Sequence, residues 1–139
     1  LAGMPEQCPV IILGGKGTIG SRVVALLQQA SDRPVCAIDV DNQAQFPSHF
    51  KGQAVIVLNI TKLGALSQYI PQLWPEAIVL NEVYPEPKRA ELGPIRCWHI
   101  AGVQGGALPA FRGAYADALP CCAAYLQGDQ FDVVLRQIA

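Results

Sequence analysis

The chain has 139 residues, of which 51% are hydrophobic and 15% charged, and its formal net charge at pH 7 is −1. This length and composition predict one folded domain with a substantial core and exclude an intrinsically disordered chain. The near-neutral charge also argues against nucleic-acid binding, because contacts to phosphates need a basic surface.

The sequence shows no signal for membrane insertion or export. No apolar run reaches the roughly 18 residues that a membrane-spanning helix needs. No basic segment with a cleavage site precedes the first apolar run, "CPVIILGG". We therefore expect a cytoplasmic protein without a membrane partner. Because the chain begins at Leu1 and not at methionine, we also expect residues 1–139 to be one domain of a longer protein.

The cysteines predict no disulfide framework and no metal site. Their number is odd, no CxxC motif occurs, and neither His49 nor His99 has metal-ligand spacing to a cysteine. Small buried thiols in a reducing compartment explain this usage, although the adjacent pair Cys121 and Cys122 leaves a redox role open. The five residues are Cys8, Cys36, Cys97, Cys121 and Cys122.

In the first half of the chain, short apolar runs alternate with a segment of helical spacing. The run "VIIL" at 10–13 is typical of a buried strand. Segment 17–30 places its apolar residues on one stripe, which predicts a helix. The apolar runs at 34–40 and 53–60 predict the second and third strands.

The second half continues the alternation with weaker helical signals. Segment 63–73 predicts a helix that Pro71 cuts short, and the runs at 76–83 and 95–103 predict two more strands. The polar, proline-rich segment 84–94 between them predicts a loop or a short helix at the edge of the sheet.

The C-terminal part predicts a helix over 114–128, kinked or started by Pro120, and then a short helix or last strand over 130–139. The predicted strands are continuous apolar runs, as in parallel sheets that are covered on both faces. We therefore expect a Rossmann-like, doubly wound α/β fold. Its mostly parallel sheet should have five to six strands, with helices on both faces.

The stretch "GGKGTIG" carries the clearest functional signal. Gly15, Gly17 and Gly20 form G-x-G-x-x-G directly after a strand and at the start of a helix, the context of a dinucleotide-binding turn. We expect Gly15 to make the tight turn, Gly17 to admit the pyrophosphate, and Gly20 to let the helix pack closely. The expected cofactor contacts at this turn are Gly14, Gly15, Lys16, Gly17, Thr18, Ile19 and Gly20.

An acidic residue follows at the expected distance. Asp39 lies 19 residues after Gly20, and a carboxylate about 20 residues on binds the adenosine ribose in this fold. Such a carboxylate repels a 2′-phosphate, so NAD is favoured over NADP. The next residue, Val40, is expected beside the adenosine. The competing interpretation is that Asp39 only ends a strand and caps a turn.

The carboxyl ends of the later strands supply further candidates, because ligands lie beyond these ends in doubly wound folds. We expect Asn59, Ile60 and Thr61 near the adenosine side, and Asn81 and Glu82 nearer the nicotinamide. Glu82 could orient a hydroxyl group or act as a base, whereas Asn59 and Asn81 equally suit turns. Gly102 is expected to leave room for a ring.

No catalytic residue is assigned. His99 lies within a predicted strand, where a buried structural histidine is the simpler reading.

The order of these motifs resembles a known group of enzymes. "GGKGTIG", the acidic second-strand end, "LNEVYPEP" and "HIAGVQGGALP" resemble the nucleotide-binding domain of shikimate-dehydrogenase-like oxidoreductases. They are also similar to the cofactor domain of acyl-carrier-protein reductases. The resemblance covers most of residues 9–127 and implies an NAD(P)-dependent oxidoreductase. The shikimate-type family commonly uses NADP, and "DVDN" departs from its basic pattern.

Three functions fit the sequence. The first is the cofactor domain of an oxidoreductase, whose small-molecule substrate binds to a further domain outside this chain. The second is a regulatory module that senses NAD without catalysis, and the third is an S-adenosylmethionine-binding domain. Exposed apolar surface on such a domain also makes a homodimer possible.

Overall fold

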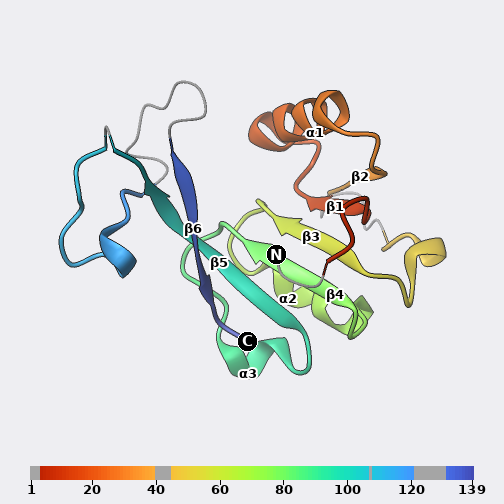
Figure 1. The fold of residues 1–139 in the computed structure, drawn as a ribbon. Helices are drawn as coiled ribbons and strands as arrows, with labels where there is room; N and C mark the ends of the chain where they lie inside the picture. Colours follow the sequence, from red (N-terminus) through yellow and green to blue (C-terminus); the bar gives the residue numbers. More distant parts are fainter. Residues whose placement is uncertain (1–3, 40–44, 107, 121–130) are drawn as a thin grey trace.

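A computed structural model describes residues 4–39, 45–106, 108–120 and 131–139. These residues form a six-stranded sheet with the strand order β2-β1-β3-β4-β5-β6 (Figure 1). The first five strands are parallel, and β6 runs antiparallel to β5. The strands are β1 (Val10–Leu13), β2 (Val35–Ile38), β3 (Val55–Asn59), β4 (Ala77–Asn81), β5 (Arg96–Gln104) and β6 (Asp132–Gln137).

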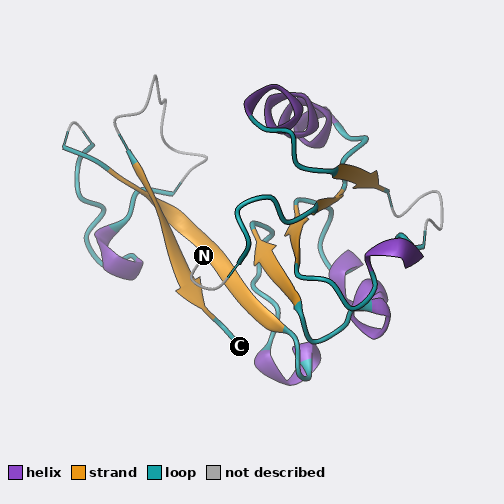
Figure 2. Cartoon of the chain, turned by 45° about the vertical axis from the view of Figure 1, so that its right-hand side comes forward, coloured by secondary structure: helices purple, strands orange, loops and turns teal. Residues whose placement is uncertain are grey.

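Helices lie on both faces of this sheet, as expected. Figure 2 shows one long helix on one side and the short helices on the other. The long helix is α1, and its Gly20 is buried against the turn that follows β1. The helical elements are α1 (Thr18–Ala30), η2 (Ser48–Phe50), α2 (Ala65–Tyr69), η3 (Ile70–Gln72), α3 (Arg89–Leu92) and η4 (Tyr115–Asp117). The predicted Rossmann-like α/β class is therefore confirmed.

The core lies between the sheet and the short helices. Alternate residues of the central strands, such as Val55 and Val57, are fully buried there. They pack with Phe46, whose ring makes edge contacts to Tyr69 and Trp74 at centroid distances of 5.4 and 6.4 Å. Burial of large apolar side chains at about 25 cal/mol per Å² is the main stabilising contribution to such a core.

The strand order creates one topological switch point. The chain leaves β1 toward α1 on one face and leaves β3 toward α2 on the other (Figure 1). The two connections diverge at the carboxyl edge between β1 and β3, which is where doubly wound folds bind their ligands. This edge carries the glycine turn and residues 59–61.

Two expected elements need correction. The helix expected over 114–128 does not form at 114–120, where only the short η4 is present. Ala116 and Asp117 have φ of +52°, and Leu119 bridges to Val103. This backbone conformation is incompatible with a regular helix. The rest of that segment, 121–130, lies outside the described residues.

The second correction concerns the position of 84–94, within which the expected short helix forms as α3. This segment connects two interior strands, β4 and β5, and does not lie at the edge of the sheet. Its helix α3 buries Leu92 completely in the core. The polar, proline-rich composition of the segment gave no sign that Leu92 packs into the core.

One further prediction has a clear outcome. Of the two alternatives for 130–139, a short helix or a last strand, the strand is confirmed, because β6 pairs with β5. No helix in the described part of the chain is both long and apolar enough to span a bilayer.

Candidate functional site

The turn after β1 is built from glycines with different physical roles. Gly14 has φ of +87°, a conformation that other residues rarely adopt, and a Cβ atom there would lie 3.0 Å from the carbonyl oxygen of Ile60. The left-handed residue of the turn is therefore Gly14, which directly precedes Gly15, the residue expected to make the tight turn. A Cβ atom on Gly15 would instead lie 2.6 Å from the Cβ of Ala37, so Gly15 allows the close approach of β2.

The last two glycines of the motif differ in what surrounds them. A Cβ atom on Gly20 would overlap the carbonyl group of Gly14, so this glycine lets α1 pack onto the turn. A Cβ atom on Gly17 would meet only the Gly14 oxygen, at 3.4 Å, which is an ordinary contact. Gly17 is exposed, and packing within the described chain does not require a glycine there.

The start of α1 is an uncapped helix N-terminus. Gly17 occupies the N-cap position without a side-chain cap, and no acidic residue lies in the first turn. The first amide groups of a helix lack intrahelical partners, so Thr18, Ile19 and Gly20 present N–H donors at the positive end of the dipole. Lys16, Thr18 and Ile19 are exposed beside them. This arrangement suits an anion such as a phosphate group.

The structure brings Asp39 to the same edge of the sheet. Asp39 directly follows β2, and the carbonyl of the preceding Ile38 accepts a hydrogen bond from the Gly14 amide at 2.8 Å. The half-buried Asp39 therefore lies next in the chain to a residue that touches the glycine turn. Val40 lies outside the described residues.

The ends of β3 and β4 are joined by their own side chains. The Asn59 amide donates to Asn81 Oδ1 at 2.7 Å, and both residues are buried. Asn59 Oδ1 accepts from the Thr61 hydroxyl at 2.9 Å. These two asparagines were expected as cofactor contacts, but their polar groups are used inside the protein. Ile60 lies against Gly14, and the Glu82 amide donates to the Asn59 carbonyl at 3.1 Å.

The same hydrogen-bond series continues to His99. The Asn81 amide nitrogen lies 3.0 Å from His99 Nδ1, and His99 is only 1% exposed. Beyond it lies Glu86, whose carboxylate oxygen is 3.8 Å from His99 Nε2 and which forms an ion pair with Arg136. Burial lowers the pKa of His99, and the Glu86 carboxylate offsets this only in part.

Sequence reasoning placed Thr61 near the adenosine side, because it follows a strand end and such positions face the ligand edge in this fold. It did not assign Glu86 or Arg136 to a site. Glu86 and Arg136 are 50 positions apart in the chain. Their ion pair depends on the antiparallel pairing of β5 and β6, which no local pattern reveals.

Gly102 does not join this group. It lies within β5 at an irregularity in the pairing with β6, and the carbonyl oxygen of Leu119 occupies the place where its side chain would be. The missing side chain therefore accommodates the protein's own backbone, and no room for a ring is left at that position.

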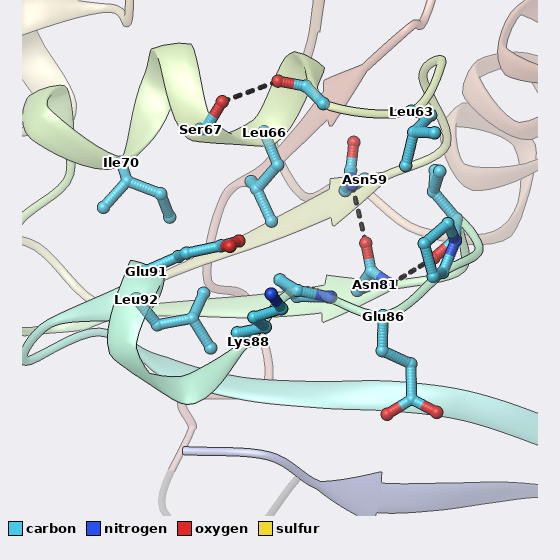
Figure 3. A pocket seen from close by; sticks show the side chains of 14 residues that line it. Asn59, Leu63, Leu66, Ser67, Ile70, Asn81, Glu86, Lys88, Glu91 and Leu92 are labelled. Carbon is cyan, nitrogen blue, oxygen red and sulfur yellow. Dashed lines mark hydrogen bonds between the residues drawn. The ribbon is translucent and has the colours of Figure 1, made fainter.

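A cleft of about 320 Å³ opens at the ends of β3 and β4, on the face that carries α2 and α3. Figure 3 shows Leu66 and Ser67 of α2 across from Lys88, Glu91 and Leu92 of the α3 region. The two asparagines lie at the strand ends. Its lining includes Leu63, Leu66, Ile70 and Leu92, together with Ser67, Lys88 and Glu91. The cleft therefore has apolar walls and a few polar groups, as in small-molecule sites.

The described cysteines show no reactive environment. Cys8, Cys36 and Cys97 are free, and burial raises the pKa of Cys97 to about 12, with the Glu86 carboxylate adding to the shift. Cys121 and Cys122 lie outside the described residues. Within the described ranges, no group of three or more His, Cys, Asp or Glu side chains is placed to hold a metal ion.

Comparison with known proteins gives one match. No curated protein and no solved structure matches the chain significantly. The model of the family described as "NAD dependent epimerase/dehydratase family" matches residues 10–105, which include the glycine turn, Asp39 and the ends of β3 and β4. This match covers more than half of the chain. The chain therefore belongs to the NAD-dependent epimerase/dehydratase family, which binds NAD(P) on a Rossmann-type fold.

Proposed function

We propose that this domain binds NAD across the carboxyl edge of its sheet and serves as the cofactor-binding part of an oxidoreductase. The observation that carries the proposal is the contrast within the glycine turn. Gly14, Gly15 and Gly20 are each explained by packing, whereas Gly17 is exposed with open space beside it. A glycine that packing does not require, at an uncapped helix start, fits a position where pyrophosphate approaches the backbone.

The preference for NAD rests on Asp39. The carboxylate follows β2 at the edge where the adenosine ribose lies in this fold. It can accept hydrogen bonds from both ribose hydroxyls, and its negative charge opposes a 2′-phosphate. The glycine turn contains one basic residue, the exposed Lys16. We propose that Asp39 outweighs Lys16 in selecting the cofactor.

The remaining strand ends have different roles in the proposed complex. We place Ile60 and Thr61 along the dinucleotide, because their turn lies against Gly14. Asn59 and Asn81 hold the edge in shape through their mutual hydrogen bond. Bound NAD supplies a hydride acceptor. The substrate is a small molecule, held with the help of a part of the protein beyond this domain.

The shikimate-dehydrogenase-like resemblance stays a prediction. The matched family is a different one that shares the dinucleotide-binding fold. We therefore propose the cofactor and the reaction class, and we assign no particular substrate.

Thermal unfolding with added ligand tests this function. NAD at about 100 times its dissociation constant should stabilise the protein by roughly 2.7 kcal/mol. NADP and S-adenosylmethionine at the same concentration should stabilise it less. Asp39→Asn should lose the preference for NAD. The matched control is Asp32→Asn, which changes an exposed acidic residue in the connection between α1 and β2 and should behave like wild type.

Two results would overturn parts of the proposal. A wild-type preference for NADP would remove the role of Asp39 and leave dinucleotide binding intact. Stabilisation by S-adenosylmethionine alone would contradict the proposal that the domain binds a dinucleotide.

A further inference from the structure

One register row of the sheet changes from apolar to polar at the carboxyl edge. Each residue of the row pairs with the next across neighbouring strands, so the row crosses all six strands. Its first two members belong to the hydrophobic core, and its last four are polar. In strand order the row is Ile38, Leu13, Asn59, Asn81, His99 and Arg136.

Backbone groups fix the direction of the hydrogen bonds in this row. The Asn81 amide nitrogen donates to the carbonyl oxygen of Val83 at 2.8 Å, and a carbonyl can only accept. Asn81 Oδ1 is therefore the acceptor for the Asn59 amide, at 2.7 Å. At the other end, the Thr61 backbone amide can only donate, and it points to Asn59 Oδ1 at 3.4 Å. Both asparagines are thus oriented by groups whose roles cannot be exchanged.

This direction determines the protonation of His99. The Asn81 amide has two N–H groups, and the one that does not bond to Val83 faces His99 Nδ1 at 3.0 Å. Nδ1 must accept, so the neutral ring carries its proton on Nε2. In the described part of the chain, His99 Nε2 is the buried side-chain polar atom that lacks a hydrogen-bond partner.

A second proton on His99 would conflict with the row. It would place an N–H donor on Nδ1, opposite the donating amide of Asn81. Turning the Asn81 amide over would bring its oxygen to the Val83 carbonyl and its nitrogen to the Asn59 amide. Asn59 would then have to turn as well, and its nitrogen would face the Thr61 backbone amide, which can only donate.

The charged groups around His99 act in opposite directions. Glu86, in the connection between β4 and α3, favours the charged ring, as do the Asn81 backbone and Glu82 after β4, and Arg136 of β6 disfavours it. The ring of Tyr84 meets the imidazole edge to face at a centroid distance of 4.6 Å. Because Glu86 is itself paired with Arg136, its attraction for a charged His99 is reduced.

Through Asn59, the hydrogen bonds of the row extend to Thr61 and so to the proposed cofactor site. A Cβ atom on Gly14 would lie 3.2 Å from Thr61 Cα, so the Thr61 turn and the glycine turn are in contact. The Thr61 hydroxyl lies within donating distance of both Asn59 Oδ1 and the Lys62 carbonyl, at 2.9 and 3.1 Å. With its one proton used in this way, the hydroxyl is an acceptor toward a ligand.

We propose that His99 is a positioning residue of the dinucleotide site. In its neutral form it holds the Asn81, Asn59 and Thr61 hydrogen bonds in one direction, and its protonation weakens dinucleotide binding. This inference rests on the proposed function for its ligand and on the hydrogen-bond row for its mechanism. The two are tested separately.

The binding test measures the NAD dissociation constant by calorimetry between about pH 8 and about pH 5, across the ordinary histidine range. In wild type the affinity should fall below the pKa of His99, by at most about tenfold for each pH unit. His99→Asn places an amide oxygen near the position of Nδ1 and does not titrate, so its affinity should stay constant. His49→Asn changes the exposed histidine of η2 and should retain the wild-type profile.

A nuclear magnetic resonance titration of the free wild-type protein tests the mechanism without a ligand or a substitution. The neutral His99 ring should carry its proton on Nε2, and the Thr61 amide resonance should shift with the same midpoint as the ring. If NAD binds equally well above and below the His99 midpoint that this titration gives, the positioning role is wrong and the proposed function stands. If NAD does not bind near pH 8, the proposed function fails. If the Thr61 amide resonance does not shift as His99 is protonated, the hydrogen-bond mechanism is wrong.

Discussion

Gly20 of α1 lies so close to Gly14 that a Cβ atom on Gly20 would overlap the Gly14 carbonyl group. The first turn of the helix thereby rests directly on the turn that follows β1. Gly17, three residues before Gly20, has no comparable neighbour, although it belongs to the same motif. One motif thus combines a residue that the fold needs and a residue that we assign to the ligand.

Gly20→Ala should destabilise the protein by about 2 kcal/mol or more. The added methyl group meets backbone atoms, which cannot move aside as a flexible side chain can. Urea unfolding gives the free energy directly. The matched control is Gly17→Ala, whose methyl group has ordinary contacts and which should cost no more than about 1 kcal/mol. Equal losses in both variants would contradict the division of roles.

Gly17→Val should abolish NAD binding and leave the fold intact. Gly17 has φ of −73° and ψ of 174°, an extended conformation that valine accepts. The larger side chain would occupy the place that we assign to the pyrophosphate. Calorimetric titration with NAD measures the binding, and circular dichroism measures the fold. Wild-type affinity in this variant would place the cofactor elsewhere.

Asn81→Leu should destabilise the protein by about 2–4 kcal/mol. The change leaves the buried Asn59 amide without its acceptor and His99 Nδ1 without its donor, and each buried unpaired group costs about 1–3 kcal/mol. Urea unfolding measures the loss. Ser67→Ala removes an exposed hydroxyl that bonds to the Gly64 carbonyl and should change the free energy by about 0.5 kcal/mol or less.

The parts of this architecture that depend on local sequence were predictable. Continuous apolar runs such as 10–13 and 53–60 predicted buried parallel strands, and β1 and β3 form there. The glycine spacing after the first run predicted a turn and a helix start, and α1 begins at Thr18. Each of these signals lies within a short window of residues. The spacing does not show which of the two adjacent glycines takes positive φ, and in the structure it is Gly14.

The buried polar row was not predictable in the same way. Asn59, Asn81 and His99 are aligned only by the register of three strands that are separate in the sequence. Each of them has an ordinary local explanation, as a turn residue or as a buried histidine. Their connection becomes visible only when hydrogen bonds between strands are assigned to particular atoms. The helix expected over 114–128 is absent at 114–120 for a related reason, since Leu119 pairs with Val103 of β5 and this pairing competes with helix formation.

We expect the domain to self-associate at high concentration. Ile19 and Leu26 of α1 are 67% and 64% exposed, and solvent-exposed side chains of this size favour association when they lie on one helix. Light scattering at increasing concentration should show a rising mean mass. Leu26→Lys should reduce the rise, whereas Gln29→Lys adds the same charge on the same helix without removing apolar surface. A monomer at every concentration would contradict this expectation.

His99 should make the stability of the protein depend on pH. Burial lowers the pKa of His99, so the folded protein binds this proton more weakly than the unfolded chain does. Below the ordinary histidine pKa of about 6.5, the unfolded state therefore gains relative to the folded state, until the pH reaches the pKa of the folded protein. The free energy of unfolding should fall as the pH decreases from about 7 to about 5, by at most about 1.4 kcal/mol per pH unit from this group.

Urea unfolding at a series of pH values measures this dependence in wild type and in His99→Asn. The two proteins differ at position 99 alone, so the difference between the two curves isolates His99. The wild-type protein should lose more stability toward acid than the variant does. Parallel curves would mean that His99 takes up its proton equally well in both states, and the fixed direction of its hydrogen bond from Asn81 would then be wrong.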